Sequence, residues 1–298
     1  MKTTNLILLS FVFLILGCEK NETDSIKGFT DGFCIVSNDK VIISHNDFDY
    51  YDYSTHLIYL KNNKSFEKDI EKIGGFTVYA DGIKMYLGQT SPGFSSFLPS
   101  GPVINTQPSG YGDYIIPIEF KIRFDSLGNS IPDQRTDIRI IESLKKYNQF
   151  HSGLSCEINS VQYSPNHVVI ELKLENNDSF NYYYLDPDKM GVNLFHYFTN
   201  GLSLRDFTHH KAFTHKMEVV QPEPWNAWKK DWLSIIKSNE TKIITLTYNS
   251  FEIVTPGEYK ATFEFPGLSH QVNKDDLQQN DGKIWLGNLD LIKDIIID

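Results

Sequence analysis

The sequence is poor in cysteine and in basic residues, and both shortages restrict what the protein can be. Three cysteines occur in 298 residues, too few for a disulfide-rich secreted scaffold or a four-cysteine zinc site. Lysine and arginine number 28 against 38 acidic residues, which gives a formal charge of −10. Because an acidic chain repels nucleic-acid phosphates, we expect no nucleic-acid partner.

Motifs for catalysis and for cofactor binding are missing as well. Gly93–Phe97 contains serines but lacks the second glycine of a nucleophile elbow, and Ser109–Gly112 lacks the lysine of a phosphate-binding loop. No HExxH or paired CxxC pattern occurs, so His209, His210 and His215 are more typical of an exposed loop than of a zinc site. We therefore expect neither a metal nor a cofactor.

Long apolar runs are absent except near the N-terminus. Leu6–Leu16 is apolar apart from one serine, and as a helix it would cover about 16 Å. That length is too short for a bilayer core of roughly 30 Å but suits a signal peptide. The following Ile15-Leu16-Gly17-Cys18 resembles a lipobox. We expect residues 1–17 to be removed and Cys18 to carry the acyl chains of a bacterial lipoprotein.

The segment after Cys18 predicts a tether rather than structure. Residues 18–28 are polar and of mixed charge, as in flexible linkers. Glu19 stands where an aspartate would form the familiar inner-membrane retention signal. We therefore expect anchoring in a Gram-negative outer membrane, on its periplasmic or its surface face. The expected partners are the membrane, through the lipid, and an unidentified envelope protein or glycan.

Residues 29–152 alternate short β-type runs with helical patterns. Asp81-Gly82 lies between two such runs and is a strong hairpin signal. Ser65 and Asp133 are each placed to cap a helix, and the second helix is expected to run to Tyr147. This order of elements predicts a small α+β domain.

Part of this first region resembles other proteins. The stretch Tyr51–Leu60 contains a Ser-Thr-His run followed by a strand pattern, and Gly75–Gly88 contains the Asp-Gly turn. Both are similar to elements of uncharacterised secreted bacterial proteins, over residues 45–105. The resemblance implies a secreted protein and brings no known activity.

Residues 153–298 contain many short β-type runs, separated at even spacing by turn signals. That pattern is typical of a β-sandwich. Thr255–Ala261 contains a Pro-Gly-x-Tyr turn that resembles the late strands of bacterial immunoglobulin-like domains. The Cys–Trp–Cys pattern of antibody domains is missing. We expect an α+β N-terminal domain followed by an all-β immunoglobulin-like sandwich.

The leading functional hypothesis is a non-enzymatic binding or structural role in the cell envelope. Gln89–Asp113 is rich in Gly, Ser and Pro and is predicted as a long loop, and loops of that length are usually functional or disordered. Its aromatic residues and the tyrosine just beyond it form the candidate ligand surface: Phe94, Phe97, Tyr111 and Tyr114.

Two alternatives stay open on sequence alone. Cys34 and Cys156 could form a disulfide outside the cytoplasm, although two separate buried thiols are the favoured interpretation. The rival function is an enzyme acting on envelope polymers, with carboxylates from Asp47, Asp49 and Asp52. Paired carboxylates with split pKa values in a cleft would support that rival.

Overall fold

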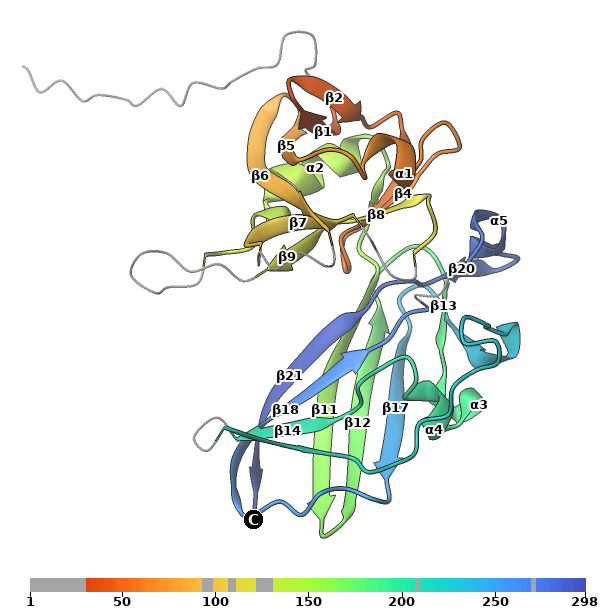
Figure 1. Cartoon of the computed structure of the whole chain (residues 1–298). Coiled ribbons are helices and arrows are strands. Elements are labelled where there is room, and N and C mark those ends of the chain that lie inside the picture. Colours follow the sequence, from red (N-terminus) through yellow and green to blue (C-terminus); the bar gives the residue numbers. More distant parts are fainter. Residues whose placement is uncertain (1–30, 93–98, 107–110, 122–130, 207–209, 269–271) are drawn as a thin grey trace, which may run out of the picture.

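The computed structural model describes residues 31–92, 99–106, 111–121, 131–206, 210–268 and 272–298. Over these residues the protein is mostly β-sheet, in five sheets of three to six strands (Figure 1). The first region contains β1 (Phe33–Ser37), β2 (Lys40–Ile43), β3 (Phe48–Asp52), β4 (Leu57–Leu60), α1 (Phe66–Asp69), β5 (Gly75–Ala80), β6 (Ile83–Ser91), β7 (Gly101–Asn105), β8 (Ile115–Pro117), β9 (Glu119–Lys121), the 3₁₀ turn η1 (Gln134–Thr136), α2 (Ile138–Lys146) and β10 (Phe150–His151).

The second region continues the chain with further strands and short helices. They are β11 (Leu154–Ser164), β12 (His167–Asn176), β13 (Tyr182–Leu185), α3 (Pro187–Met190), α4 (Val192–Phe195), β14 (Ser203–Asp206), β15 (Lys211–Thr214), η2 (Lys230–Trp232), β16 (Leu233–Ile236), β17 (Thr241–Tyr248), β18 (Gly257–Phe265), α5 (Lys274–Leu277), β19 (Gln278–Gln279), β20 (Gly282–Ile284) and β21 (Leu289–Ile297).

Two sheets make up the first region. The larger has the order β2-β1-β5-β6-β7-β9 and the smaller the order β10-β3-β4-β8. Asp81 and Gly82 join β5 to β6 with φ values of 46° and 77°, as expected for an Asp-Gly hairpin. One face of α2 covers this region through Ile140 and Leu144, which pack into the same apolar cluster as Phe33.

Sequence-based expectations for this region hold only in part. The predicted 133–147 helix is split, because Asp133 caps η1 and Asp137 caps α2 separately. The helix predicted after Ser65 is only the four residues of α1. The predicted long loop contains β7, which pairs with β6 and β9. The region is β-rich, and the expected α+β class is not shown.

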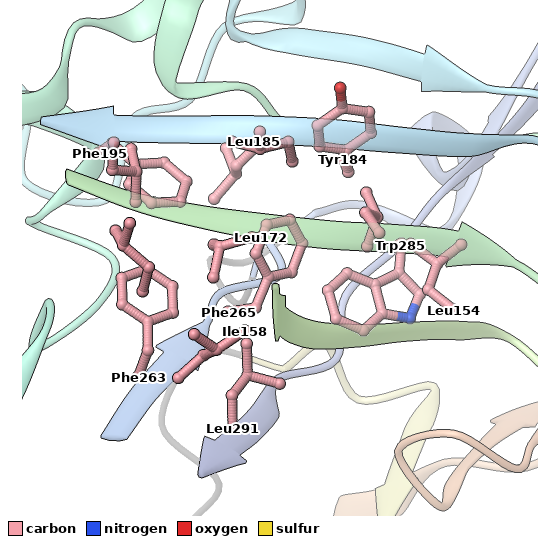
Figure 2. Close-up of a cluster of buried hydrophobic side chains, with 14 of the residues drawn as sticks. Leu154, Ile158, Leu172, Tyr184, Leu185, Phe195, Phe263, Phe265, Trp285 and Leu291 are labelled. Atoms are coloured by element: carbon pink, nitrogen blue, oxygen red, sulfur yellow. The ribbon is translucent and has the colours of Figure 1, made fainter. Parts of the chain in front are cut away.

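The second region is built from sheets that face each other. One has the order β11-β12-β17 and another β15-β14-β18-β21, and Figure 1 shows them lying one over the other. Strand β12 alternates half-buried and buried residues along its whole length, which points every second side chain inward. Leu172 from β12 belongs to the same buried apolar cluster as Phe263 and Phe265 from β18 (Figure 2). This arrangement is sandwich-like, in agreement with the sequence pattern.

A lysine side chain connects the two facing sheets where the edge strand β21 lies next to the edge strand β11. Lys293 of β21 donates to the carbonyl oxygens of Ile158 and Asn159, at 3.0 and 2.8 Å. Those carbonyls lie where the register of β11 shifts against β12, at a β-bulge. The lysine therefore satisfies backbone groups that the bulge leaves outside the ladder.

The two regions share packing rather than meeting only through the chain. Tyr50, Leu57, Tyr59 and Ile115 come from strands of the first region, yet they belong to the apolar cluster that fills the second. Gly153 makes the turn between the regions with φ +69°. A Cβ there would lie 2.3 Å from Asp52 Oδ1, so the connection needs a glycine. In the described part of the chain, no helix is long and apolar enough to cross a bilayer.

Candidate functional site

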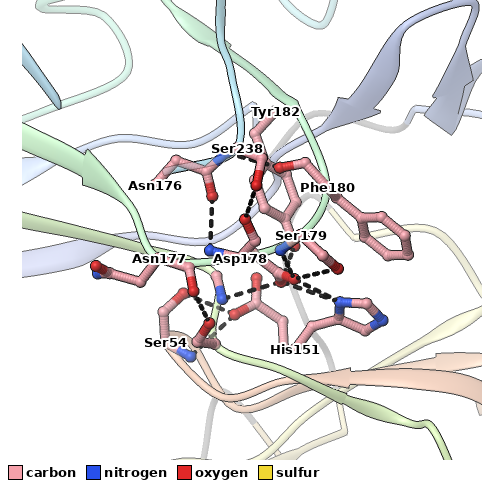
Figure 3. Close-up of polar contacts among 12 residues, drawn as sticks. Ser54, His151, Asn176, Asn177, Asp178, Ser179, Phe180, Tyr182 and Ser238 are labelled. Carbon is pink, nitrogen blue, oxygen red and sulfur yellow. Dashed lines mark hydrogen bonds and ion pairs between the residues drawn. The ribbon is translucent and has the colours of Figure 1, made fainter. Parts of the chain in front are cut away.

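Asp178 is the centre of a polar network at the junction of the two regions (Figure 3). Its carboxylate lies 2.9 Å from His151 Nδ1 and accepts hydrogen bonds from Tyr182 Oη at 2.8 Å and from the Ser179 backbone N–H at 2.6 Å. Burial works to raise the pKa of this carboxyl, but the hydrogen bond and charge of His151, with the tyrosine, lower the pKa to about 2. Asp178 therefore stays ionised.

Asp52 is a second buried carboxyl in the same junction, on β3 beside His151. Its side chain accepts from the backbone N–H of Ser54 at 2.9 Å and from Ser54 Oγ at 2.6 Å. Burial outweighs these bonds, and the negative charge of Asp178 adds to it, so the pKa of Asp52 rises to about 6. The pKa of Asp52 therefore lies above the ordinary value of an aspartate, and the pKa of Asp178 lies below it.

The three carboxylates that were candidates for an enzyme do not converge. Asp47 closes a local turn by accepting from the N–H and hydroxyl of Ser44, at 2.8 and 2.7 Å. Asp49 is half exposed and lies 3.8 Å from Lys274. Asp52 is 1 % exposed inside the junction. The split pKa pair is therefore Asp52 with Asp178, and it is sealed from solvent rather than open in a cleft.

Stacked aromatic rings close the rest of the junction. Tyr50 stacks on Tyr59 with centroids 4.1 Å apart, and His151 stacks on Phe180 at 4.0 Å. Lys283 Nζ lies 3.9 Å from the Tyr50 centroid and 4.0 Å from that of Phe180. Burial lowers the pKa of this lysine to about 8. These packed groups hold the two regions together.

Beside this network lies a cavity of about 480 Å³ that both regions line, here called the junction cleft. The first region contributes the turn before β4 and the strand β9, and the second contributes β18 and the start of β21. The lining residues are Ser54, Thr55, His56, Leu57, Tyr111, Pro117, Ile118, Glu119, Phe120, Lys121, Arg135, Glu264, Asn288, Leu289 and Asp290. A cleft of this size lies within the range of small-molecule sites.

His56 is the most constrained residue of the junction cleft. Its φ is +55°, in the left-handed region, which is unfavourable for a residue with a Cβ. The ring is 7 % exposed, and burial together with the charge of Arg135 lowers its pKa to about 3, so it is neutral. Its Nδ1 lies 2.8 Å from the hydroxyl of Tyr51.

That hydrogen bond determines which ring nitrogen of His56 carries the proton. Burial raises the pKa of Tyr51, so its hydroxyl keeps its proton. Within the described residues, Nδ1 of His56 is the hydrogen-bond partner of this hydroxyl, so we assign the tautomer in which the buried hydroxyl donates to Nδ1 and its proton is not left unpaired. The proton of the neutral ring then lies on Nε2, and the cleft wall presents an N–H donor.

The two basic side chains of the junction cleft are already paired. Arg135 donates to Asp133 at 2.6 to 3.1 Å and also to the carbonyl of Ile118. Lys121 forms an ion pair with Glu119 at 2.5 Å.

Glu264, from the second region, is held differently. It accepts a hydrogen bond of 2.8 Å from Asn288 Nδ2, which helps to keep its carboxyl charged. Burial and then the charge of Asp290 raise the pKa of Glu264 above its ordinary value. The two carboxyl groups make this wall of the cleft rich in hydrogen-bond acceptors.

The four residues of the predicted ligand surface do not lie at one site in the described part of the chain. Tyr111 lines the junction cleft. Tyr114 donates from its hydroxyl to the carbonyl of Val272 at 2.8 Å and so holds the two regions together instead. Phe94 and Phe97 lie outside the described residues, as does Cys18.

The two candidate cysteines are free, and two of the three candidate histidines, His210 and His215, lie in the described part of the chain. Cys34 and Cys156 are both free thiols, and burial raises the pKa of each to about 12. His215 stacks on His196, with ring centroids 4.6 Å apart, while His209 lies outside the described residues. No group of three or more His, Cys, Asp or Glu side chains is placed to hold a metal ion in the part of the chain that the structure describes.

Sequence reasoning missed most of the cleft. His56 was visible only as the last residue of a Ser-Thr-His run, and its left-handed backbone has no sequence signal. Arg135, Glu264 and Asn288 come from separate stretches that no motif connects. Tyr111 was predicted because it is an aromatic residue within a loop rich in Gly, Ser and Pro.

Comparisons with known proteins add little. The chain matches no family model and no curated protein. Two solved structures of the β-glucosidase from Kluyveromyces marxianus, one in complex with glucose and one labelled with selenomethionine, align with 49 % of this chain at 10 % identity and a TM-score of 0.21. The aligned part spans 14 % of those enzymes. A similarity this low carries no argument about fold or activity.

Proposed function

We propose that the protein is a lipid-anchored cell-envelope protein that binds a ligand, without catalysis, in the junction cleft. The observation that carries the proposal is His56: a strained, neutral histidine held by Tyr51 at the wall of a cleft that both regions line. Backbone strain of this kind costs roughly 1–3 kcal/mol and tends to occur where a side chain must be aimed for function.

The anchor in this proposal rests on the N-terminal sequence. An apolar run of signal-peptide length precedes Gly17-Cys18, and Glu19 replaces the retention aspartate. Lipidation at Cys18, a tether over residues 18–28 and attachment to the outer membrane follow from that pattern. Several acyl chains together would make the attachment stable.

The finer fold assignment also belongs to the proposal. We assign residues 29–152 to a small α+β domain because α2 packs on β1 and β5, and residues 153–298 to an immunoglobulin-like sandwich because two antiparallel sheets face each other over one core. A sandwich of this kind serves many binding proteins, so the function is argued from the cleft and not from the fold.

The rival enzyme hypothesis has one observation in its favour, the split pKa values of Asp52 and Asp178. Catalytic carboxyl pairs often show such a split. However, Asp52 is 1 % exposed, and its hydrogen bonds are made with the neighbouring Ser54. A substrate cannot reach that carboxyl without opening the junction, so the geometry favours binding.

A photo-crosslinking experiment on the full chain in cells tests the proposal. A benzophenone amino acid replaces Asp290, an exposed residue of the cleft rim. The matched control places it at Asp188, an exposed residue of α3 that does not line the cleft. We expect an adduct from position 290 that is lost when His56 is also changed to asparagine. Equal adducts from both positions, or none from 290, would refute the binding role of the cleft.

A further inference from the structure

The charges in the junction cleft limit what it can hold. Both basic side chains of the lining form ion pairs with carboxylates of the protein itself: Arg135 with Asp133, and Lys121 with Glu119. The acidic groups Glu264 and Asp290 lie together on the opposite wall. Among the described residues that line the cleft, an anionic ligand would find no unpaired cation and two repelling carboxyl groups.

The groups that remain available are neutral N–H and O–H donors, together with oxygen atoms that accept hydrogen bonds from hydroxyl groups. His56 presents its Nε2 N–H, and in the described part of the chain the hydroxyl of Tyr111 has no hydrogen-bond partner. The carboxylate oxygens of Glu264 accept hydrogen bonds from O–H donors. The rings of Tyr111 and Phe120 add apolar surface beside these polar groups. This mixture matches a ligand that carries many hydroxyl groups on an apolar frame.

A peptide strand fits the cleft less well. Strand β9 is the edge of its sheet, and a peptide could in principle extend it. On the outward side, however, Ile118 already uses both backbone groups: its N–H donates to the His56 carbonyl at 3.1 Å, and its carbonyl accepts from Arg135. Phe120 is the next residue along β9 whose backbone groups face away from the sheet. Its partner on β7 is Pro102, which has no N–H, so this pair is not a hydrogen-bonded pair of the ladder. Within the described part of this edge, one available residue cannot hold a strand ladder.

We propose that the ligand of the junction cleft is a neutral oligosaccharide, bound through its hydroxyl groups. Ring hydroxyls would accept from His56 Nε2 and donate to Glu264, while Tyr111 packs against a sugar face. The proposal rests on the cleft being the binding site, as argued above, and it adds the chemical class of the ligand.

An array of neutral glycans, with acidic glycans and random hexapeptides as further arms, tests the ligand class on the purified full chain. We expect binding to neutral glycans only. Tyr111→Phe removes one hydroxyl and should weaken binding about fivefold, as for the loss of one net hydrogen bond. His56→Asn tolerates the left-handed backbone and should abolish binding. Tyr197→Phe, whose hydroxyl bonds the Trp225 carbonyl away from the cleft, should leave binding unchanged.

The outcomes separate the two proposals. Binding of acidic glycans or peptides that responds to His56→Asn would overturn the ligand class and leave the cleft as the binding site. Glycan binding that neither cleft variant weakens would overturn the ligand site. No binding on any arm would overturn the glycan proposal, and the crosslink at position 290 then decides separately whether the cleft binds anything.

Discussion

Replacing Asp52 by asparagine should make the protein more stable at neutral pH and leave it nearly unchanged in acid. Asp52 is 1 % exposed, and its pKa is raised from 3.8 to about 6 by burial. A carboxyl whose folded pKa lies above its unfolded value binds protons more tightly when folded. Its ionisation therefore costs stability as the pH rises from about 4 through 6.

The size of the effect follows from the two pKa values. The cost of ionising Asp52 is about 3 kcal/mol at pH 7, about half of that at pH 5 and below about 1 kcal/mol at pH 4. Asparagine resembles the protonated carboxyl, and its Oδ1 can accept the same two hydrogen bonds from Ser54. The variant should thus gain most of these amounts in its free energy of unfolding.

Urea unfolding at pH 4, 5, 6 and 7, followed by fluorescence, measures the difference between wild type and Asp52→Asn. The matched control is Asp49→Asn, three residues earlier on the same strand and half exposed near Lys274. That change should alter stability by only about 0.5 kcal/mol, because exposed ion pairs contribute little. A gain that does not depend on pH, or a loss of stability at pH 7, would refute the assignment of a buried, reluctantly ionised Asp52.

Three further predictions concern the junction and the anchor. Asp178→Asn should lose about 2 kcal/mol at pH 7, because the lowered pKa of Asp178 stabilises the fold above pH 4 and that contribution disappears as the pH falls through 2; urea titrations at pH 7 and pH 3 should therefore differ, and equal losses would contradict it. Gly153→Ala should destabilise by about 2 kcal/mol or more, since a Cβ at φ +69° would lie 2.3 Å from Asp52 Oδ1; an unchanged melting temperature would count against the close approach. Cys18→Ser should abolish labelling with radioactive palmitate and release the chain from the membrane fraction; retained label would disprove lipidation at that residue.

Local patterns predicted the elements whose partners are close in sequence. The Asp81-Gly82 turn formed the expected hairpin because its two residues tolerate the positive φ values that the turn needs. The alternation in β12 predicted an inward face because strand side chains point alternately to the two sides of a sheet.

Elements that depend on distant partners were predicted poorly. Strand β7 was hidden inside an expected loop, because Gly101 and Pro102 are weak strand formers and its pairing with β6 is parallel and non-local. The expected helix from Asp133 was divided because Asp133 and Asp137 both cap, and Arg135 between them turns to the Ile118 carbonyl. Here tertiary contacts outweighed helix propensity.

The sequence by itself determined the strand-rich composition, the tight turns and the expectation of a lipid anchor, because each depends on neighbouring residues. Only the tertiary structure brought His56, Arg135 and Glu264 to one cleft and paired Asp52 with Asp178. The reason is physical: a pKa or a binding surface depends on burial and on charges that approach in space. Residues that lie so far apart in the sequence carry no local pattern that predicts such a contact.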